Sequence, residues 1–330
     1  MAFVQQQPLV SVILPTFNRL QFLPAAIDSV FAQTYEHWEL VIADDGSNDE
    51  TREYLRRLEA SPRVKLVWLA HTGNPAIVRN AGLRVARGEY VAFLDSDDFW
   101  LPRKLQLQIA AMRAQPTRQW SYTALTRVDE AGQPLEARSG GRFVPHEGSI
   151  VMQLLSWQAC VATPTVMARR RLLEACGGFD ERQGQMEDYE MWLRLALQSD
   201  VAVLVEPLTC VRVHRDHFSV NGIPAVLAKR RLIENKLTSI DDPVIRDVLW
   251  AELSKNSVTL AVANSAARDG RAAWRMLASS WSYSWWRGGW WWGATKALLR
   301  FVMPDSLAMA VRRRIRPVTW PARERGPLQP

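Results

Sequence analysis

Three aspartates lie within four residues in the stretch FLDSDDFW, directly after an apolar run. Like charges this close repel one another, so the cluster costs free energy unless a cation or hydrogen-bond donors offset it. If the chain is still extended there, Asp95 and Asp97 lie on the same side. Carboxylate oxygens suit Mg²⁺ or Mn²⁺, which often binds through one or two carboxylates while also holding phosphates and water. The alternative is a turn in which Asp98 caps the next helix.

A second acidic cluster, ADDGSNDET, follows another apolar run. In one interpretation, Asp45 accepts a hydrogen bond from a polar N–H of a bound base. In the other, Gly46 permits a tight turn, and Asn48 or Asp49 caps the helix that follows. Taken alone, the stretch favours the turn.

A third acidic pair, Glu187 and Asp188, begins the stretch EDYEMW. A carboxylate there could take the proton from an attacking hydroxyl group, which has a high pKa and needs a base to become a nucleophile. Two acids in the first turn of a helix would equally stabilise that helix through its macrodipole. For Arg79 and Asn80, in VRNAGLRVARG, two interpretations also remain: they contact a ligand, or they are surface residues of a helix.

The elements that must position these residues alternate between apolar, β-rich runs and amphipathic helical patterns. Strands are expected at residues 9–17, 38–47, 64–70 and 89–98, and helices at 23–33, 50–60, 76–86 and 102–114. Near-continuous apolar strands between amphipathic helices indicate a mostly parallel sheet covered on both faces, which is a doubly wound α/β core. Ligands of such sheets bind beyond the carboxyl ends of the strands. The polar clusters at 15–18, 44–47 and 95–98 are therefore expected to meet in one crevice.

The pattern loosens after residue 115 and is wholly helical from about residue 225. In between we expect a strand with a turn, a strand–helix–glycine turn, a helix and a last strand, at residues 120–135, 163–181, 187–197 and 201–214. The chain is therefore expected to comprise an α/β domain, residues 1–222, and a helical C-terminal region, residues 223–330.

The net charge of +7 is concentrated near the C-terminus. Residues 296–330 contain eight Lys and Arg against two Asp and Glu, so the remainder is close to neutral. A neutral body with a basic tail argues against a nucleic-acid partner and favours a local surface contact.

The C-terminal region is also rich in tryptophan, with seven of the fifteen between residues 274 and 292. Trp274, Trp281 and Trp285 recur at helical spacing. In one interpretation these rings pack a helical subdomain against the catalytic core. In the other they lie at a membrane surface, where the headgroup region favours tryptophan and the basic run VRRRIR at 311–316 would attract anionic lipid.

Cysteine usage and the N-terminus bear on the compartment. The three cysteines, Cys160, Cys176 and Cys210, form no CxxC pair, which favours buried thiols in a reducing compartment. The segment MAFVQQQPLV lacks the basic and long apolar segments of a secretory signal. No apolar run reaches the roughly 18 residues that a spanning helix needs. We therefore expect a cytoplasmic protein, with peripheral contact at the inner face of the plasma membrane.

Together the motifs resemble a known family. They are, in order, VSVILPTFNR, ELVIADDGSNDET, RNAGLRVARGEYVAFLDSDDFWLPRKL, GGFDE and EDYEMWLRL, within residues 8–220. This order and spacing are similar to those of the family 2 glycosyltransferases, nucleotide-sugar enzymes with a Rossmann-like GT-A fold. The resemblance implies a GT-A catalytic domain at residues 1–222.

The resemblance implies a nucleoside pocket built from matching positions. Pro15, Thr16 and Phe17 would line it, with Phe17 contacting the base. Asp45 would accept a hydrogen bond from the N3–H of uracil or thymine, and Arg79 would help to hold the nucleotide. The implied donor is thus a UDP- or dTDP-linked sugar.

The diphosphate and the metal are implied to lie at the next strand end. Asp95 and Ser96 would lie by the ribose and diphosphate, and Asp97 would ligate a divalent Mg²⁺ or Mn²⁺. His214 resembles the family's late histidine beside the metal, with His217 as the alternative three residues on.

The family's catalytic base maps to Asp188, with Glu187 as the near alternative. Direct attack by an activated acceptor hydroxyl would invert the anomeric centre. The expected acceptor is a saccharide or a lipid-linked saccharide in bacterial cell-surface polysaccharide or glycolipid synthesis. QPTRQW has one residue too many for the Q-x-x-R-W signature of processive members, so a non-processive enzyme is expected.

Two other classes of protein remain open at this level. A nucleotidyltransferase of sugar phosphates would share the α/β core but would need a glycine-rich loop where this chain has PTFNRL. A non-catalytic nucleotide-sugar-binding protein is disfavoured by the presence of both Asp97 and Asp188. Dinucleotide and P-loop sites are excluded because GxGxxG and Walker A motifs are absent.

Overall fold

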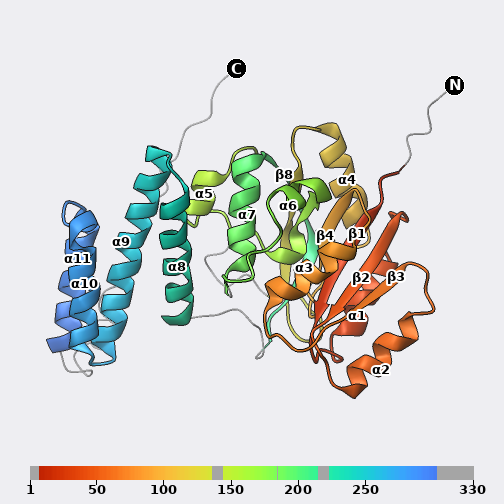
Figure 1. Ribbon diagram of the computed structural model, residues 1–330, viewed down its shortest axis with the longest axis horizontal. Helices are drawn as coiled ribbons and strands as arrows, with labels where there is room; N and C mark the ends of the chain where they lie inside the picture. The colour runs from red at the N-terminus through yellow and green to blue at the C-terminus, as the bar shows by residue number, and fades with distance from the viewer. Residues whose placement is uncertain (1–6, 136–143, 184, 215–222, 303–330) are drawn as a thin grey trace. The chain divides into compact units, whose positions relative to one another are not determined.

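The computed structural model describes residues 7–135, 144–183, 185–214 and 223–302 (Figure 1). The basic run at 311–316 and His217 lie outside the described residues. The described residues divide into two compact units, one up to Leu249 and one from Trp250 onward, and the division falls within one long helix. Compactness does not test where a catalytic domain ends, so the boundary near residue 222 stays a prediction.

The first unit is built on one mixed, mostly parallel sheet with strand order β3-β2-β1-β4-β7-β6-β8-β5. Strands β1 to β4 run parallel in the order expected for a doubly wound core, and β7 and β5 pair antiparallel to their neighbours. The predicted α/β class is confirmed. The strands are β1 (Val10–Thr16), β2 (Trp38–Asp44), β3 (Val64–Trp68), β4 (Tyr90–Phe93), β5 (Phe99–Trp100), β6 (Trp120–Val128), β7 (Met167–Arg169) and β8 (Val201–Arg212).

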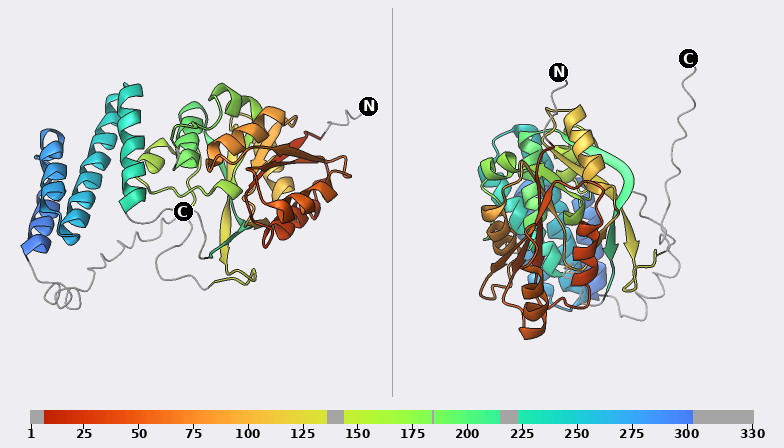
Figure 2. Two further views of the ribbon diagram at one scale, coloured as in Figure 1. Left: turned by 60° about the horizontal axis from the view of Figure 1, so that its bottom comes forward. Right: turned by 90° about the vertical axis from the view of Figure 1, so that its right-hand side faces the viewer.

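The helices of this unit cover both faces of the sheet (Figures 1 and 2). Alternation along β1 directs Val10, Val12 and Leu14 into a core with α1 and α4, while Ile13 meets α3 at Gly82 on the other face. The helices are α1 (Leu23–Phe31), α2 (Asp49–Leu58), α3 (Pro75–Val85), α4 (Lys104–Ala114), α5 (Val151–Leu155), α6 (Arg170–Ala175), α7 (Glu187–Gln198) and α8 (Ile223–Ser239), with a 3₁₀ turn, η1, at Thr163–Thr165.

The strand register brings three polar clusters to one edge of the sheet. Thr16 at the end of β1 lies beside Asp44 at the end of β2, and Phe93 at the end of β4 lies beside Ile13. The Asp45 backbone N–H then donates to the Thr16 carbonyl at 2.9 Å. The residues that follow β1, β2 and β4 therefore emerge side by side.

The second unit contains most of α9 (Pro243–Ala266), together with α10 (Gly270–Ser284) and α11 (Gly288–Val302). Its core consists of Ala261, Leu277, Trp290 and Ala297. Gly293 is needed where α9 and α11 approach, because a Cβ there would lie 2.0 Å from Val258 Cγ1. Of the tryptophans in this unit, Trp290 thus packs as a structural ring. None of the described helices has the length and apolar character required to cross a bilayer.

The cysteines differ from the expectation in one respect. Cys210 is buried and Cys176 is half-buried, but Cys160 is exposed, so the prediction of buried thiols is wrong for Cys160. All three are free thiols.

Candidate functional site

The first part of the site is a stacked pair of rings above a buried carboxylate. The ring of Phe17 lies 4.0 Å from that of His71, with 20° between their planes. Asp45 accepts hydrogen bonds from the Thr72 backbone N–H and hydroxyl at 2.8 Å each, and from the Gly73 N–H at 2.9 Å. A carboxylate can accept about four hydrogen bonds. His71 Nδ1 also lies 3.1 Å from Asp45 Oδ2, so a further donor such as a base N–H would have to replace His71 or share that oxygen with it.

Two buried oxygen atoms beside this loop, Thr16 Oγ1 and Asp44 Oδ1, have no hydrogen-bond partner among the described residues. They belong to register partners at the ends of β1 and β2, and Pro15 lies directly before Thr16. An unpaired buried polar atom costs about 1–3 kcal/mol, which a ligand or water could relieve. This end of the sheet is therefore the side on which a ligand would be accommodated.

The stretch ADDGSNDET contains the turn and the helix cap of one interpretation, with Asn48 as the capping residue. The role of Asp45 in the other interpretation is not decided by this cap. The Asn48 side chain accepts from the Thr51 N–H and caps α2, and Gly46 has a φ of +75°. Asp44 accepts from the Ser47 N–H at 2.9 Å. The turn and the cap are thus present, while Asp45 points its carboxylate at the loop after β3.

Arg79 joins the second strand-end cluster to the acidic pair of α7. Its guanidinium donates to Asp95 at 2.9 Å and to Glu187 at 2.6 Å, and the side chain is buried. Burial raises the pKa of the Asp95 and Glu187 carboxyls, and Arg79 opposes that rise. A surface position for Arg79 is excluded, because its buried guanidinium holds the buried Glu187 and the half-buried Asp95 together.

A short strand pair brings the end of β8 beside the aspartate cluster. Strand β5 pairs antiparallel with β8, and His214 Nε2 lies 2.9 Å from Asp97 Oδ2. Arg212 donates its backbone N–H to Asp98 and its guanidinium to the Asp97 carbonyl, both at 2.8 Å. Burial and the neighbouring Asp97 raise the pKa of Asp98 well above its usual range. The idea that Asp98 caps the next helix is wrong, since α4 begins at Lys104 without a side-chain cap.

Asp97 and His214 together offer one carboxylate and one imidazole. Within the described ranges, no group of three or more His, Cys, Asp or Glu is arranged to hold a metal ion. Mg²⁺ or Mn²⁺ that carries a diphosphate needs only one or two protein ligands, because phosphate and water oxygens fill the remaining positions. The pair therefore fits such an ion and does not fit a closed protein cage. Ser96, between the aspartates, is buried.

The two acids at the start of α7 have different surroundings. Asp188 is half-buried; its Oδ2 accepts from the Thr163 hydroxyl at 2.9 Å and its Oδ1 from the Tyr189 N–H at 2.7 Å. Glu187 is buried and bound to Arg79. Asp188 thus receives bonds from neutral donors, and its carboxylate is oriented without being neutralised by a direct cation.

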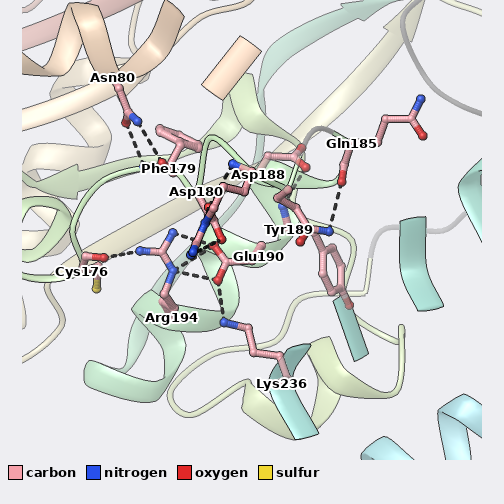
Figure 3. Close-up of polar contacts among 12 residues, drawn as sticks. Asn80, Cys176, Phe179, Asp180, Gln185, Asp188, Tyr189, Glu190, Arg194 and Lys236 are labelled. Carbon is pink, nitrogen blue, oxygen red and sulfur yellow. Dashed lines mark hydrogen bonds and ion pairs between the residues drawn. The ribbon is translucent and has the colours of Figure 1, made fainter. Parts of the chain in front are cut away.

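Asn80 fixes the glycine turn that precedes this acidic pair (Figure 3). Its Oδ1 accepts from the Phe179 N–H at 2.8 Å, and its Nδ2 donates to the Phe179 carbonyl and to Glu181 Oε1 at 2.9 Å each. Gly178 has a φ of +72°, and a Cβ there would lie 2.7 Å from Asn80 Oδ1. The GGFDE motif is therefore a loop whose conformation is fixed by hydrogen bonds of one side chain, that of Asn80, with the Phe179 backbone and with Glu181.

A polar cavity of about 750 Å³ lies beside this loop, between α7 and α8. Figure 3 shows Arg194 and Lys236 both directed at Glu190, which is buried. Arg194 Nη2 lies 2.6 Å from Glu190 Oε2, and Lys236 Nζ lies 2.5 Å from Oε1. The third acid of EDYE thus ties α8 to α7.

The sequence analysis missed three residues that shape the site. His71 follows β3 in the stretch HTGN, so the rule that polar residues gather at strand ends could have found it. Thr163 and Arg212 carry no comparable signal, because they reach Asp188 and the aspartate cluster only through tertiary packing.

Comparison with known proteins gives a consistent family match. Residues 11–176 match the family model described as "Glycosyl transferase family 2". A relative from Escherichia coli, "UDP-Glc:alpha-D-GlcNAc-diphosphoundecaprenol beta-1,3-glucosyltransferase WfgD", is 29% identical over 238 residues, which cover 70% of this chain and 89% of that protein. An "Uncharacterized glycosyltransferase" of Rickettsia bellii is 32% identical over 209 residues, 63% of this chain. The match covers only 29% of that Rickettsia protein, so this chain spans about a third of the length of such relatives.

Solved structures show the same fold at low sequence identity. The structure of S. aureus TarS 1–349 in complex with UDP-GlcNAc superposes with a TM-score of 0.63 and 18% identity, covering 92% of this chain and 91% of that one. At this identity the likeness establishes the fold alone. It confirms the predicted GT-A-type α/β fold with a helical C-terminal region.

Proposed function

Because the chain belongs to glycosyl transferase family 2, we propose that it transfers a sugar from a nucleotide-diphosphate sugar to an acceptor hydroxyl with inversion. The observation that carries this proposal is the contrast between the two acids of α7. Glu187 is bound to Arg79, whereas Asp188 is half-buried and held by the Thr163 hydroxyl. A base must be oriented yet remain able to accept a proton, which is the situation of Asp188.

In this proposal the nucleoside lies against the stacked rings at the end of β1. Phe17 contacts the base, Thr16 and Pro15 line the pocket, and Asp45 accepts the N3–H of a uracil or thymine. The base N–H would take the acceptor position on Asp45 Oδ2 that His71 Nδ1 approaches at 3.1 Å. Arg79 acts on the nucleotide through Asp95, which it holds in place.

The diphosphate lies by Asp95 and Ser96, and Asp97 with His214 would hold a divalent cation. When bound, such a cation offsets the negative charge that grows on the leaving diphosphate. The side chains contribute orientation: Arg212 binds the Asp97 carbonyl, and Asp98 binds the backbone of Arg212. The aspartate cluster is thereby anchored on both sides.

Transfer then requires one proton to move. The acceptor hydroxyl attacks the anomeric carbon on the face opposite the nucleotide, its proton passes to an oxygen of Asp188, and the bond from the anomeric carbon to the diphosphate oxygen breaks. The Thr163 hydroxyl keeps the carboxylate oriented during this step. Attack from the opposite face inverts the anomeric configuration without a covalent enzyme intermediate.

The proposed setting is bacterial cell-surface polysaccharide or glycolipid synthesis. The name of the Escherichia coli relative specifies a UDP-linked donor and a diphosphoundecaprenol-linked acceptor. The S. aureus structure of similar fold is a complex with UDP-GlcNAc. For this chain we propose a UDP- or dTDP-sugar donor, a saccharide or lipid-linked saccharide acceptor, and a cytoplasmic location at the inner face of the plasma membrane.

The test is a screen of UDP-, dTDP- and GDP-sugars for release of nucleoside diphosphate, with Mg²⁺, Mn²⁺ or a chelator. We expect release from a UDP- or dTDP-sugar that the chelator abolishes, and an anomerically inverted product by NMR. Asp97→Asn should weaken donor binding in the presence of metal and leave the weaker metal-free binding unchanged. Release of pyrophosphate from a nucleoside triphosphate and a sugar phosphate would instead identify a nucleotidyltransferase.

A further inference from the structure

The hairpin of α10 and α11 exposes most of its tryptophans. Trp290 is buried, and its indole N–H donates to Ser280 Oγ at 2.8 Å. The other six rings are between 47% and 70% exposed: Trp274, Trp281, Trp285, Trp286, Trp291 and Trp292. A helical hairpin needs only its inner rings to fold, so the outer six are available for another contact.

These six outer rings are called the tryptophan surface, and three of them, Trp274, Trp281 and Trp291, line one groove. Trp281 contacts Trp290 and Trp291 edge to face, with centroids 5.3 and 5.5 Å apart. A groove of about 1020 Å³ lies between the two helices, and its apolar lining includes Trp274, Trp281, Trp290, Trp291, Leu277 and Leu298. Contiguous exposed apolar surface of this kind marks a binding surface more often than a bare exterior.

The charge around the surface is strongly positive. Residues 267–302 contain six Lys and Arg against one acid, Asp269. Arg271, Arg275 and Lys296 are exposed, and Lys296 Nζ lies 4.9 Å from the centre of the Trp292 ring. An occupant of the surface must therefore combine apolar material with negative charge.

We propose that this tryptophan surface binds an anionic lipid bilayer, with the rings at headgroup depth and the cations on the lipid phosphates. Tryptophan is favoured at the membrane–water interface, and amphipathic helices with cationic polar residues lie in that plane. Each cation near an anionic surface adds to the attraction. A second copy of this chain would bring a like-charged surface against it, and nucleic acid would leave the aliphatic Leu298 and Leu299 without partners. The biological sense of the contact rests on the proposed function, but lipid binding itself needs no sugar transfer.

The experiment is co-sedimentation of the full chain with vesicles of phosphatidylcholine alone or with phosphatidylglycerol, without donor or acceptor. We expect the protein to bind the mixed vesicles, and added salt should weaken that binding. Binding to the neutral vesicles should be about tenfold or more weaker. Trp274→Ser with Trp292→Ser, the two most exposed rings, should weaken binding about tenfold or more. The matched control is Val205→Ser, an equally exposed apolar residue in β8, which should bind as the parent protein does.

Charge reversal gives an independent test that does not touch the rings. Arg271→Glu with Arg275→Glu should weaken binding to the mixed vesicles about tenfold or more and leave thermal unfolding unchanged. Parent-like binding by both double variants would overturn the proposal. So would binding of nucleic acid, or concentration-dependent dimerisation, in a protein that does not bind the mixed vesicles. Sugar transfer to a soluble acceptor is assayed separately, so its failure is distinguishable from failure of lipid binding.

Discussion

The edge of the sheet and the tryptophan surface break the usual distribution of side chains in opposite ways. At the edge, charged groups are buried: Arg79, Asp98 and Glu187 are each less than 9% exposed. On the tryptophan surface, large apolar rings face solvent. Burying a charge and exposing an apolar ring both cost free energy in the isolated protein.

The two regions meet these costs differently. At the edge, every buried charge just named has a partner within the protein, since Arg79 binds two carboxylates and Asp98 binds the Arg212 backbone. The exposed rings contact neighbouring rings, as Trp281 does Trp291, and lie near cations such as Lys296, while much of each ring stays in solvent. The edge is therefore organised by contacts within the protein, whereas the exposed rings would lose their contact with water only against a partner such as the proposed bilayer. Five substitutions test this contrast, in order of decreasing effect.

Asp188→Asn tests the acid of α7 that accepts its hydrogen bonds from neutral donors, the Thr163 hydroxyl and the Tyr189 N–H. Turnover should fall about 10²- to 10⁴-fold, because an amide cannot take the acceptor proton. Donor affinity, measured by calorimetry with the nucleotide, should stay within about twofold because the nucleotide contacts lie on other residues. Asp241→Asn, at an exposed position, is the control. Full turnover in Asp188→Asn would remove the base from the proposed mechanism.

Arg79→Met tests the buried ion pairs. It leaves Asp95 and Glu187 without their cation and should lower the free energy of unfolding by about 3–5 kcal/mol, measured by urea denaturation. The exposed Arg57–Glu53 pair provides the matched control. Arg57→Met should cost no more than about 1 kcal/mol. Similar losses for both variants would show that burial does not set the strength of these pairs.

Gly178→Ala tests the loop that Asn80 holds. It combines a left-handed backbone, φ +72°, with a contact 2.7 Å from Asn80 Oδ1. Gly177→Ala has the same backbone problem, φ +79°, but no atom within 4 Å. Both should destabilise by about 1–2 kcal/mol through strain, and Gly178→Ala should cost about 1 kcal/mol more from the clash. Equal decreases in Tm for the two variants would mean that Asn80 moves away from the added Cβ at no cost in free energy.

Lys104 is a buried cation of the first unit that lies against Trp100 and Gln108 and has no acidic partner among the described residues. Burial lowers its pKa well below the ordinary lysine value. The unfolded chain therefore binds more protons between the two pKa values, and the free energy of unfolding should rise with pH across that window.

Lys104→Met should remove this rise in stability with pH. At neutral pH the free energy of unfolding should change by no more than about 1 kcal/mol. The variant loses the hydrogen bond to Gln108, but it also no longer has to bury an ionisable amine, and the two effects offset each other. Urea denaturation at several pH values measures the slope, with the exposed Lys255 changed to Met as the control. An unchanged slope would show that Lys104 keeps an ordinary pKa.

Trp292→Ser should have the smallest effect on folding, within about 0.5 kcal/mol, because the ring is mostly exposed. Trp290→Ser, two residues earlier in the core, should cost about 3–5 kcal/mol. Thermal unfolding of the two variants measures the difference. A large loss for Trp292→Ser would make the outer rings structural and erase the contrast between the two regions.

Much of the fold followed from periodicity. Most strands and helices up to α4 begin and end within about two residues of the ranges expected from apolar runs and caps, because local patterning determines them. The exceptions are β2 and β4, which end at Asp44 and Phe93, before the polar residues that the expected ranges included. The two-residue strand β5 and the short helix α5 (Val151–Leu155) were not expected. Such short elements form through pairing and packing, which leave no periodic signal.

The site was predictable at the level of strand ends but not of individual bonds. Thr16, Asp45 and Asp95 follow from the rule that parallel strands present their ends at one edge. The bond from Arg79 to Glu187 spans 108 residues, and that from His214 to Asp97 spans 117. No local pattern encodes such separations, so the division of roles between Glu187 and Asp188 could not be derived from the motif.

These long spans have a consequence for synthesis on the ribosome. The contacts of Phe17 and Asp45 use residues from the first quarter of the chain, so they can form early. Asp95 meets Arg79 soon after, but Glu187 and His214 emerge only about a hundred residues later. Domains generally acquire structure as the chain grows, and long-range contacts come last. A nascent chain stalled before α7 would therefore hold the first part of the sheet edge without Glu187, Asp188 and His214, and the edge would be completed only after the final strand.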